Sequence, residues 1–114
     1  ARVFTERERI LCSGDARRLA GRFASKEAVS KALGTGIGHL GISFQDIEID
    51  ADDMGAPIVL LHGAAKTRFS ALGGMSVALS ISHEDEYAVA FCVVEIDVSM
   101  RHETAMNEGV PFDE

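Results

Sequence analysis

The sequence predicts a single α+β domain with a mainly antiparallel sheet. Two observations support this fold class: a long helical segment over 15–33, and two pairs of short β-rich segments that are each joined by a turn. The chain has 114 residues, of which 46% are hydrophobic and 25% are charged, as in an ordinary one-domain globular protein. We expect the domain to occupy 1–96 and a polar tail to occupy 97–114.

Two helices are expected at the start of the chain. Thr5 followed three residues later by Glu8 is the capping-box pattern, which predicts a short helix from Thr5. Asp15 can cap a second, long helix that runs to about Leu33. The glycine-rich segment 34–36 then ends this helix, because glycine readily adopts the left-handed C-cap conformation.

Two hairpins and a third helix follow. Alternating apolar and acidic residues, a turn and an apolar run predict a hairpin over 46–62. Residues 64–72 fit a short helix that ends at two glycines. The segments 75–82 and 87–94 are rich in β-formers and predict a second hairpin, and a short helix is expected near 101–107.

Charge is distributed unevenly along the chain. Residues 1–31 carry eight of the 11 basic side chains but only four of the 18 acidic ones, while the whole chain has a net charge of −7. An acidic chain with one basic third is a poor general nucleic-acid binder, and this third suits a compact anionic ligand, an acidic protein or a solvated helix face. No apolar run approaches the roughly 20 residues needed to span a bilayer.

The two cysteines give a hint about the compartment. Cys12 and Cys92 have neither zinc nor redox spacing, so a reducing, cytoplasmic setting is expected. Among the histidines, no pair has metal-ligand spacing.

The long helix is expected to place a carboxylate on its apolar face. Four apolar residues share that face at helical spacing: Ala16, Leu19, Ala20 and Phe23. Glu27 falls within this stripe, and Lys31 lies one turn further along. A carboxylate on a core-facing surface needs a partner, so either Glu27 pairs with Lys31 or it binds a metal.

A basic stripe lies on another face of the same helix. Arg18, Arg22 and Lys26 repeat every four residues, with Arg17 nearby. Such a stripe can bind phosphates or an acidic partner, or it can be a solvated surface.

Two further motifs are candidates for ligand binding. The glycine loop that contains Gly34 and Gly36 follows a helix rather than preceding one, so it is not a phosphate loop and fits either a C-cap or backbone close to a ligand. Ser80 and Ser82 share one face of a strand and His83 lies at its lip. Because adjacent residues of a strand point apart, a Ser-His nucleophile pair is excluded.

Taken together, these motifs resemble the holo-[acyl-carrier-protein] synthases of the 4'-phosphopantetheinyl transferase family. The resemblance rests on the blocks Phe4-Thr5-x-x-Glu8, 19–36 (LAGRFASKEAVSKALGTG), Asp46-Ile47-Glu48-Ile49 with Gly55-x-Pro57, and Ser80-Ile81-Ser82-His83-Glu84 with Tyr87-Ala88-Val89-Ala90. It covers about 3–95. The implied fold is the phosphopantetheinyl transferase fold, with the sheet packed on one long helix and shorter helices.

The resemblance implies an activity and a set of site residues. Members transfer 4'-phosphopantetheine from coenzyme A to a serine of an apo acyl carrier protein and release adenosine 3',5'-bisphosphate, with Mg²⁺ bridging the pyrophosphate. Glu27 matches the metal ligand, and Lys31 matches the lysine that assists the leaving phosphate. The coenzyme A positions implied are Arg22, Lys26, Gly34, Gly36, Ser82 and His83. Homotrimers with active sites between subunits, fatty-acid biosynthesis and an acidic carrier protein docking near Arg17 and Arg18 are also implied.

One family feature has no counterpart among these residues. The family's first strand carries an Asp that serves as a second metal ligand, and no residue here matches it, so a rebuilt metal site would need another carboxylate, for which Asp97 is the candidate. Two alternatives to an active transferase follow: a non-catalytic or truncated relative that binds coenzyme A or carrier protein, and an α+β oligomeric module without a ligand.

Overall fold

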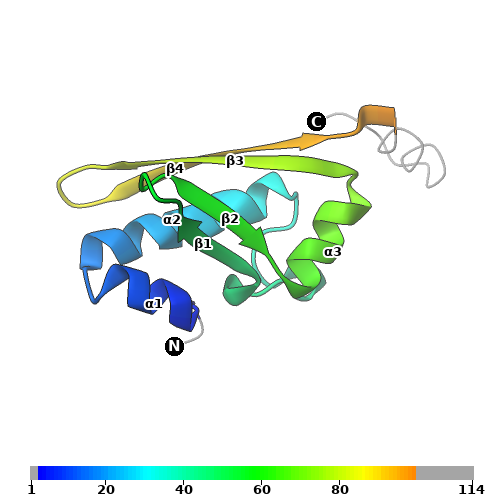
Figure 1. Ribbon diagram of the computed structural model, residues 1–114. Helices are drawn as coiled ribbons and strands as arrows, with labels where there is room; N and C mark the ends of the chain where they lie inside the picture. Colours follow the sequence, from blue (N-terminus) through cyan, green and yellow to red (C-terminus); the bar gives the residue numbers. More distant parts are fainter. Residues whose placement is uncertain (1–2, 100–114) are drawn as a thin grey trace.

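The computed structural model describes residues 3–99 of the chain. Two helices come first, α1 (Glu6–Cys12) and α2 (Ala16–Ala32), followed by two 3₁₀ turns at His39–Gly41 and Phe44–Asp46. The hairpin of β1 (Ile47–Ala51) and β2 (Pro57–Leu61), the helix α3 (Gly63–Ala71), and the hairpin of β3 (Gly74–His83) and β4 (Ala88–Ile96) complete it (Figure 1). The predicted order of elements and the α+β class are confirmed. The helix expected near 101–107 lies outside the described residues.

Both early helices begin as their cap residues predict. Thr5 accepts a hydrogen bond from the amide of Glu8 at 3.1 Å, and the Glu8 carboxylate accepts one from the amide of Thr5 at 2.8 Å. The Asp15 carboxylate accepts from the amides of Arg17 and Arg18 at the start of α2. These bonds satisfy amides that a helix N-terminus leaves without partners.

The strands form two antiparallel pairs among the described residues. In β1–β2, Ile47 pairs with Leu61, and in β3–β4, His83 pairs with Ala88 at the end of a much longer ladder. The long β3–β4 hairpin lies along α2, while β1 lies on the other side of that helix, close to α1 (Figure 1). α2 is therefore held between the two sheets and carries residues to both.

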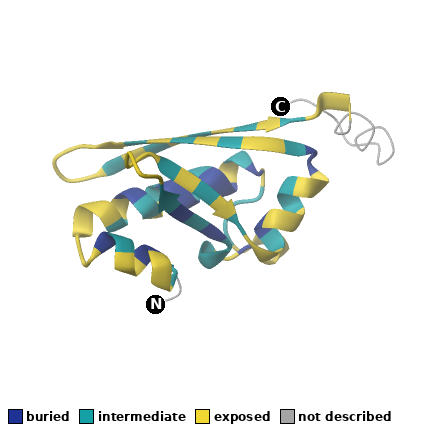
Figure 2. Cartoon of the chain, in the orientation of Figure 1, coloured by how far each residue is buried: buried dark blue, intermediate teal, exposed yellow. Residues whose placement is uncertain are grey.

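The core gathers where α2 meets β1, α3 and the loop between them (Figure 2). Its buried members are Val29, Leu33, Ile42, Ile47, Ile49, Ala65 and Leu72. None of the helices in the part of the chain that the structure describes combines the length and apolar character needed to cross a bilayer.

The buried face of α2 differs from the predicted one. Ala16, Ala20 and Phe23 are exposed, and Leu19 is half-buried. The buried positions are Gly21, Ser25, Lys26, Val29 and Ser30. Small residues on this face let the hairpin and β1 approach the helix backbone, and the apolar stripe expected to be core is instead left on the surface.

Candidate functional site

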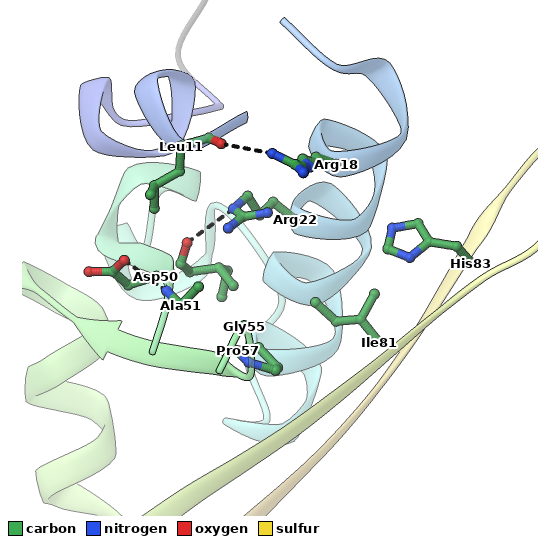
Figure 3. Close-up of a pocket in the computed structure, with 10 residues that line it drawn as sticks. Leu11, Arg18, Arg22, Asp50, Ala51, Gly55, Pro57, Ile81 and His83 are labelled. Atoms are coloured by element: carbon green, nitrogen blue, oxygen red, sulfur yellow. Dashed lines mark hydrogen bonds between the residues drawn. The ribbon is translucent and has the colours of Figure 1, made fainter. Parts of the chain in front are cut away.

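A basic cavity of about 510 Å³ lies beside α2. α1, β1, the turn after β1 and the end of β3 form its other walls (Figure 3). Arg18 and Arg22 of α2 and His83 of β3 line it, and Asp50 is the acidic side chain at its edge. Two guanidinium groups and an imidazole directed at one space favour an anionic ligand.

Backbone carbonyls hold both arginines at the cavity wall. Arg22 is half-buried, and its Nε donates to the carbonyl of Ile49 at 3.2 Å. Arg18 donates through a terminal nitrogen to the carbonyl of Leu11 at 3.4 Å, and its Nε lies 3.8 Å from the Asp15 carboxylate. The predicted arginine stripe therefore faces a cavity, and a guanidinium that is already oriented loses little entropy when a phosphate binds.

His83 stands between two cavities. It is the last residue of β3, and its Nε2 lies 3.1 Å from the backbone carbonyl of Arg17 on α2. Besides the basic cavity it lines a second one of about 240 Å³, together with Arg17 and the turn 84–88. Arg22 and His83, which the resemblance assigns to the coenzyme A phosphates, line the same cavity in this structure.

Glu27 and Lys31 lie in a different place. They line an open groove of about 560 Å³ between α2 and β4, whose apolar walls include Phe23 and Phe91. Glu27 is half-buried and Lys31 is exposed. Within residues 3–99 no ion pair joins these two side chains, so the alternative of an intrahelical pair is not supported.

The two halves of the expected site point in different directions. Arg22 and Glu27 are five residues apart on α2, which places them about 140° apart around the helix axis. Arg22 faces the cavity beside β1, and Glu27 faces the groove beside β4. In a single copy, no cavity described here contains both.

The prediction that Lys26 contacts the coenzyme A phosphates is wrong. Its side chain is fully buried and forms an ion pair with the equally buried Glu8, at 2.9 Å. Its Nζ also donates to the carbonyls of Phe44 and Ile47. Burial lowers the pKa of Lys26, and the hydrogen bond to Glu8 partly opposes this shift. An ammonium with these partners holds α1, α2 and β1 together and has no path to a ligand.

Gly34 and Gly36 form a helix cap. Both have positive φ angles, 82° and 72°, which favour glycine. Their amides donate to the carbonyls of Lys31 and Ser30, at 2.9 Å and 3.1 Å. The C-cap interpretation is confirmed. Because both amides already have partners, neither is free to donate to a ligand in this geometry, and the expectation that this backbone lies close to a ligand stays a prediction.

Ser82 and Asp97 are also separated from the groups they were expected to join. Ser82 is exposed and pairs with Val89, and strand alternation turns it to the face of β3 opposite His83. The Asp97 carboxylate accepts from Ser99, and its amide donates to Gly73. Asp97 therefore lies at the far end of the hairpin and does not line the groove of Glu27 as the structure describes it.

Sequence reasoning missed the role of Glu8. The capping-box pattern explains one carboxylate oxygen, but the other accepts from the amide of Ile49 at 2.7 Å and the side chain is fully buried. The sequence did contain a signal for this buried partner. The repeat Arg18–Arg22–Lys26 extends onto the face of α2 that packs against the rest of the fold, so its last cation needs a buried anion.

The donor set fits a magnesium ion only in part. No three His, Cys, Asp or Glu side chains gather to hold a metal within 3–99. Mg²⁺ is usually bound by one or two carboxylates together with waters and substrate phosphates, so Glu27 would supply one such ligand when a pyrophosphate is present.

The chain matches known proteins over most of its length. Residues 1–92 match the model of the 4'-phosphopantetheinyl transferase superfamily. The holo-[acyl-carrier-protein] synthase of Clostridium acetobutylicum is 47% identical over 98 residues, which are 83% of this chain and 77% of that protein. The synthase of Shewanella pealeana is 53% identical over 97 residues, 82% of this chain and 73% of that protein.

Solved structures agree with the sequence matches. The Helicobacter pylori holo-[acyl-carrier-protein] synthase in complex with coenzyme A is 38% identical with a TM-score of 0.73, covering 82% of this chain and 78% of that one. The Bacillus anthracis synthase, in complex with CoA (3',5'-ADP), is 44% identical with a TM-score of 0.67, covering 84% and 78%. This chain belongs to the holo-[acyl-carrier-protein] synthases of the 4'-phosphopantetheinyl transferase superfamily.

Proposed function

We propose that this chain transfers 4'-phosphopantetheine from coenzyme A to a serine of an apo acyl carrier protein, giving holo carrier protein and adenosine 3',5'-bisphosphate. The observation that carries the proposal is the cavity at which Arg18, Arg22 and His83 meet. A nucleotide with several phosphates is the kind of ligand that such a cavity suits. The Helicobacter pylori and Bacillus anthracis relatives hold coenzyme A or 3',5'-ADP in their complexes.

Each side chain has a distinct part in this reaction. Arg22 and His83 bind the nucleotide phosphates, and Arg18 adds charge at the cavity edge. As the serine oxygen gives up its proton to Glu27 or to a water and bonds to the pantetheine-bearing phosphorus, the bond from that phosphorus to the leaving oxygen breaks, and negative charge develops on the leaving phosphate. Lys31 supplies a positive charge or a proton to that phosphate.

Glu27 is the proposed magnesium ligand. A half-buried carboxylate with no ion-pair partner within 3–99 is available for a cation. When bound, Mg²⁺ neutralises the charge of the pyrophosphate and of the leaving group. Glu27 would hold the ion beside the ammonium of Lys31, which lines the same groove.

A homotrimer is the proposed assembly, with each active site shared between two subunits. The separation of Arg22 and His83 from Glu27 supports it, because a second copy can bring the groove of one subunit to the cavity of the next. A ring of identical contacts with threefold rotation closes without leaving a surface unpaired.

The outer face of β3–β4 is the proposed subunit contact. Val89, Phe91 and Val93 of β4 are 50%, 68% and 51% exposed, and they pair with Ser82, Ser80 and Ala78 of β3. A contiguous apolar strand face with small partners marks a protein interface.

The remaining parts of the proposal are Mg²⁺ as cofactor, a role in fatty-acid biosynthesis and a cytoplasmic location. A cytoplasmic location suits Cys12 and Cys92, which are both free thiols.

The carrier protein is the proposed macromolecular partner. The start of α2 exposes Arg17 and Arg18, and α1 exposes Arg9. An acidic carrier protein would be attracted to this surface and would place its serine near the bound coenzyme A. The basic third of the chain would then have two roles: it would bind the carrier protein at the surface and the nucleotide in the cavity.

Calorimetric titration with coenzyme A tests the binding half of this proposal. The intact chain should bind, and Arg22→Ala should weaken binding about tenfold, as expected for a lost charge-assisted hydrogen bond. Lys66→Ala, an exposed cation on α3, is the matched control and should leave the affinity unchanged. Equal effects of the two substitutions would place the nucleotide elsewhere.

A further inference from the structure

Gly21 lies in the middle of α2, where glycine is among the poorest helix formers. The structure gives a steric reason for it. A Cβ built on Gly21 would lie 2.7 Å from Nε2 of His83 and 3.2 Å from Cγ2 of Ile81. Because real Cβ atoms essentially never come within 3.0 Å of another heavy atom in this way, any side chain here would displace the imidazole.

The imidazole uses this space to reach the helix backbone. Nε2 of His83 lies 3.1 Å from the carbonyl oxygen of Arg17, and a carbonyl can only accept, so Nε2 carries the hydrogen. In an α-helix the same carbonyl accepts from the amide four residues later, which here belongs to Gly21. His83 therefore contacts the turn of α2 at which Gly21 has no side chain, and its ring lies between β3 and this helix (Figure 3).

We propose that Gly21 is a positioning residue for coenzyme A binding, acting through His83. Its missing side chain lets the ring rest against α2, and the bond to Arg17 fixes the Nε2–H tautomer. Nε2 is then occupied, so an anionic ligand at the junction of the two cavities that His83 lines is bound through Nδ1, which donates a hydrogen bond to it once a second proton is taken up by the ring. This inference rests on the proposed function, because it assigns His83 to the coenzyme A phosphates.

The test is Gly21→Ala, examined by two readouts. Long-range ¹H–¹⁵N spectra of the imidazoles report the tautomer of His83, with His83→Ala identifying its signals. We expect the intact chain to show the Nε2–H form and Gly21→Ala to lose it. Coenzyme A affinity should fall about tenfold, as in His83→Ala, while the melting temperature stays level or rises because alanine favours the helix.

The double variant Gly21→Ala/His83→Ala completes the cycle. It should bind coenzyme A no more weakly than His83→Ala alone, because Gly21 acts only through the ring. Should Gly21→Ala be destabilised, restoration of stability by adding His83→Ala would locate the clash at this contact and support the inference. An absence of rescue would count against it.

The inference and the proposed function fail in different ways. If the intact chain binds coenzyme A, His83→Ala weakens binding and Gly21→Ala retains both the tautomer and the affinity, then the positioning role is overturned and the function stands. If the intact chain binds no coenzyme A, the proposed function is refuted, and the assignment of His83 to the coenzyme A phosphates is refuted as well.

Discussion

Lys26 and Glu8 form a fully buried ion pair, with Nζ of the lysine 2.9 Å from Oε1 of the glutamate. The ammonium also donates to the carbonyls of Phe44 and Ile47, and the second carboxylate oxygen accepts from the amide of Ile49. Every charged atom of the pair thus has a backbone or side-chain partner. Three segments, α1, α2 and β1, meet at this point.

Breaking one side of the pair should destabilise the fold strongly. Lys26→Met leaves the Glu8 carboxylate buried without its cation, and such losses cost roughly 3–5 kcal/mol. The double variant Glu8→Gln/Lys26→Met should be more stable than the sum of the single losses predicts, because neither charge is then buried alone. Urea unfolding measures both quantities. Lys66→Met, on the exposed surface of α3, is the control. If Lys26→Met lowers the free energy of unfolding no more than this control does, the structural role of the Lys26–Glu8 pair is refuted.

Glu27 should be required for transfer but not for folding. Its carboxylate lies at an open groove and is half-buried, with no ion-pair partner in the described part of the chain. The free energy of unfolding of Glu27→Ala should therefore lie within about 0.5 kcal/mol of that of the intact chain. The variant should show no detectable phosphopantetheine transfer. Glu6→Ala, a Glu→Ala change at an exposed position of α1, should keep the full rate. A folded Glu27→Ala variant with an unchanged rate would remove the proposed metal ligand.

Mixing two impaired variants tests the shared active site. At coenzyme A concentrations well below the dissociation constant, Arg22→Ala should keep about a tenth of the transfer rate because its affinity is about tenfold lower, and Glu27→Ala should have no detectable activity. In a 1:1 mixture that exchanges subunits, about one quarter of the activity should return, because each shared site draws one subunit of each kind at random. Adding Phe91→Asp to both variants should abolish this recovery by charging the proposed contact face. Sites complete within one subunit would show no recovery in the first mixture.

Glu48 should contribute to stability in a pH-dependent manner. The hydrogen bond from Thr5 is the main cause that lowers the pKa of this carboxyl, and His62, 3.0 Å away, lowers it further. A group whose pKa is lower in the folded state stabilises the fold above its ordinary value of 4.5, and this contribution is lost as the pH falls through the lowered pKa. The free energy of unfolding of the intact chain should therefore fall more steeply below about pH 4.5 than that of Glu48→Gln. Parallel curves would contradict the assigned shift.

The sequence predicted elements well because their signals are local. The Thr5–Glu8 capping box, the Asp15 cap and the turn residues act over three or four positions, so each helix and hairpin could be placed without knowledge of the rest. The family motifs, rather than the residue spacing, assign Arg22 and His83 to one ligand, and both residues line the same cavity.

The side chains of α2 could not be assigned in the same way. Helical periodicity finds an apolar stripe, but it does not say which sheet the helix faces. The stripe with Phe23 is on the surface, and the buried face holds Lys26 instead. A buried lysine depends on Glu8, 18 residues earlier, and on carbonyls beyond the helix, so its burial is a property of the tertiary structure.

Mass spectrometry of an apo acyl carrier protein, incubated with this chain, coenzyme A and Mg²⁺, tests the central claim most directly. The account predicts a gain of one phosphopantetheine per carrier protein, which disappears when a chelator is added or when the carrier's acceptor serine is replaced by alanine. No gain under conditions in which the chain binds coenzyme A would contradict transferase activity and leave a coenzyme A-binding relative of the synthases.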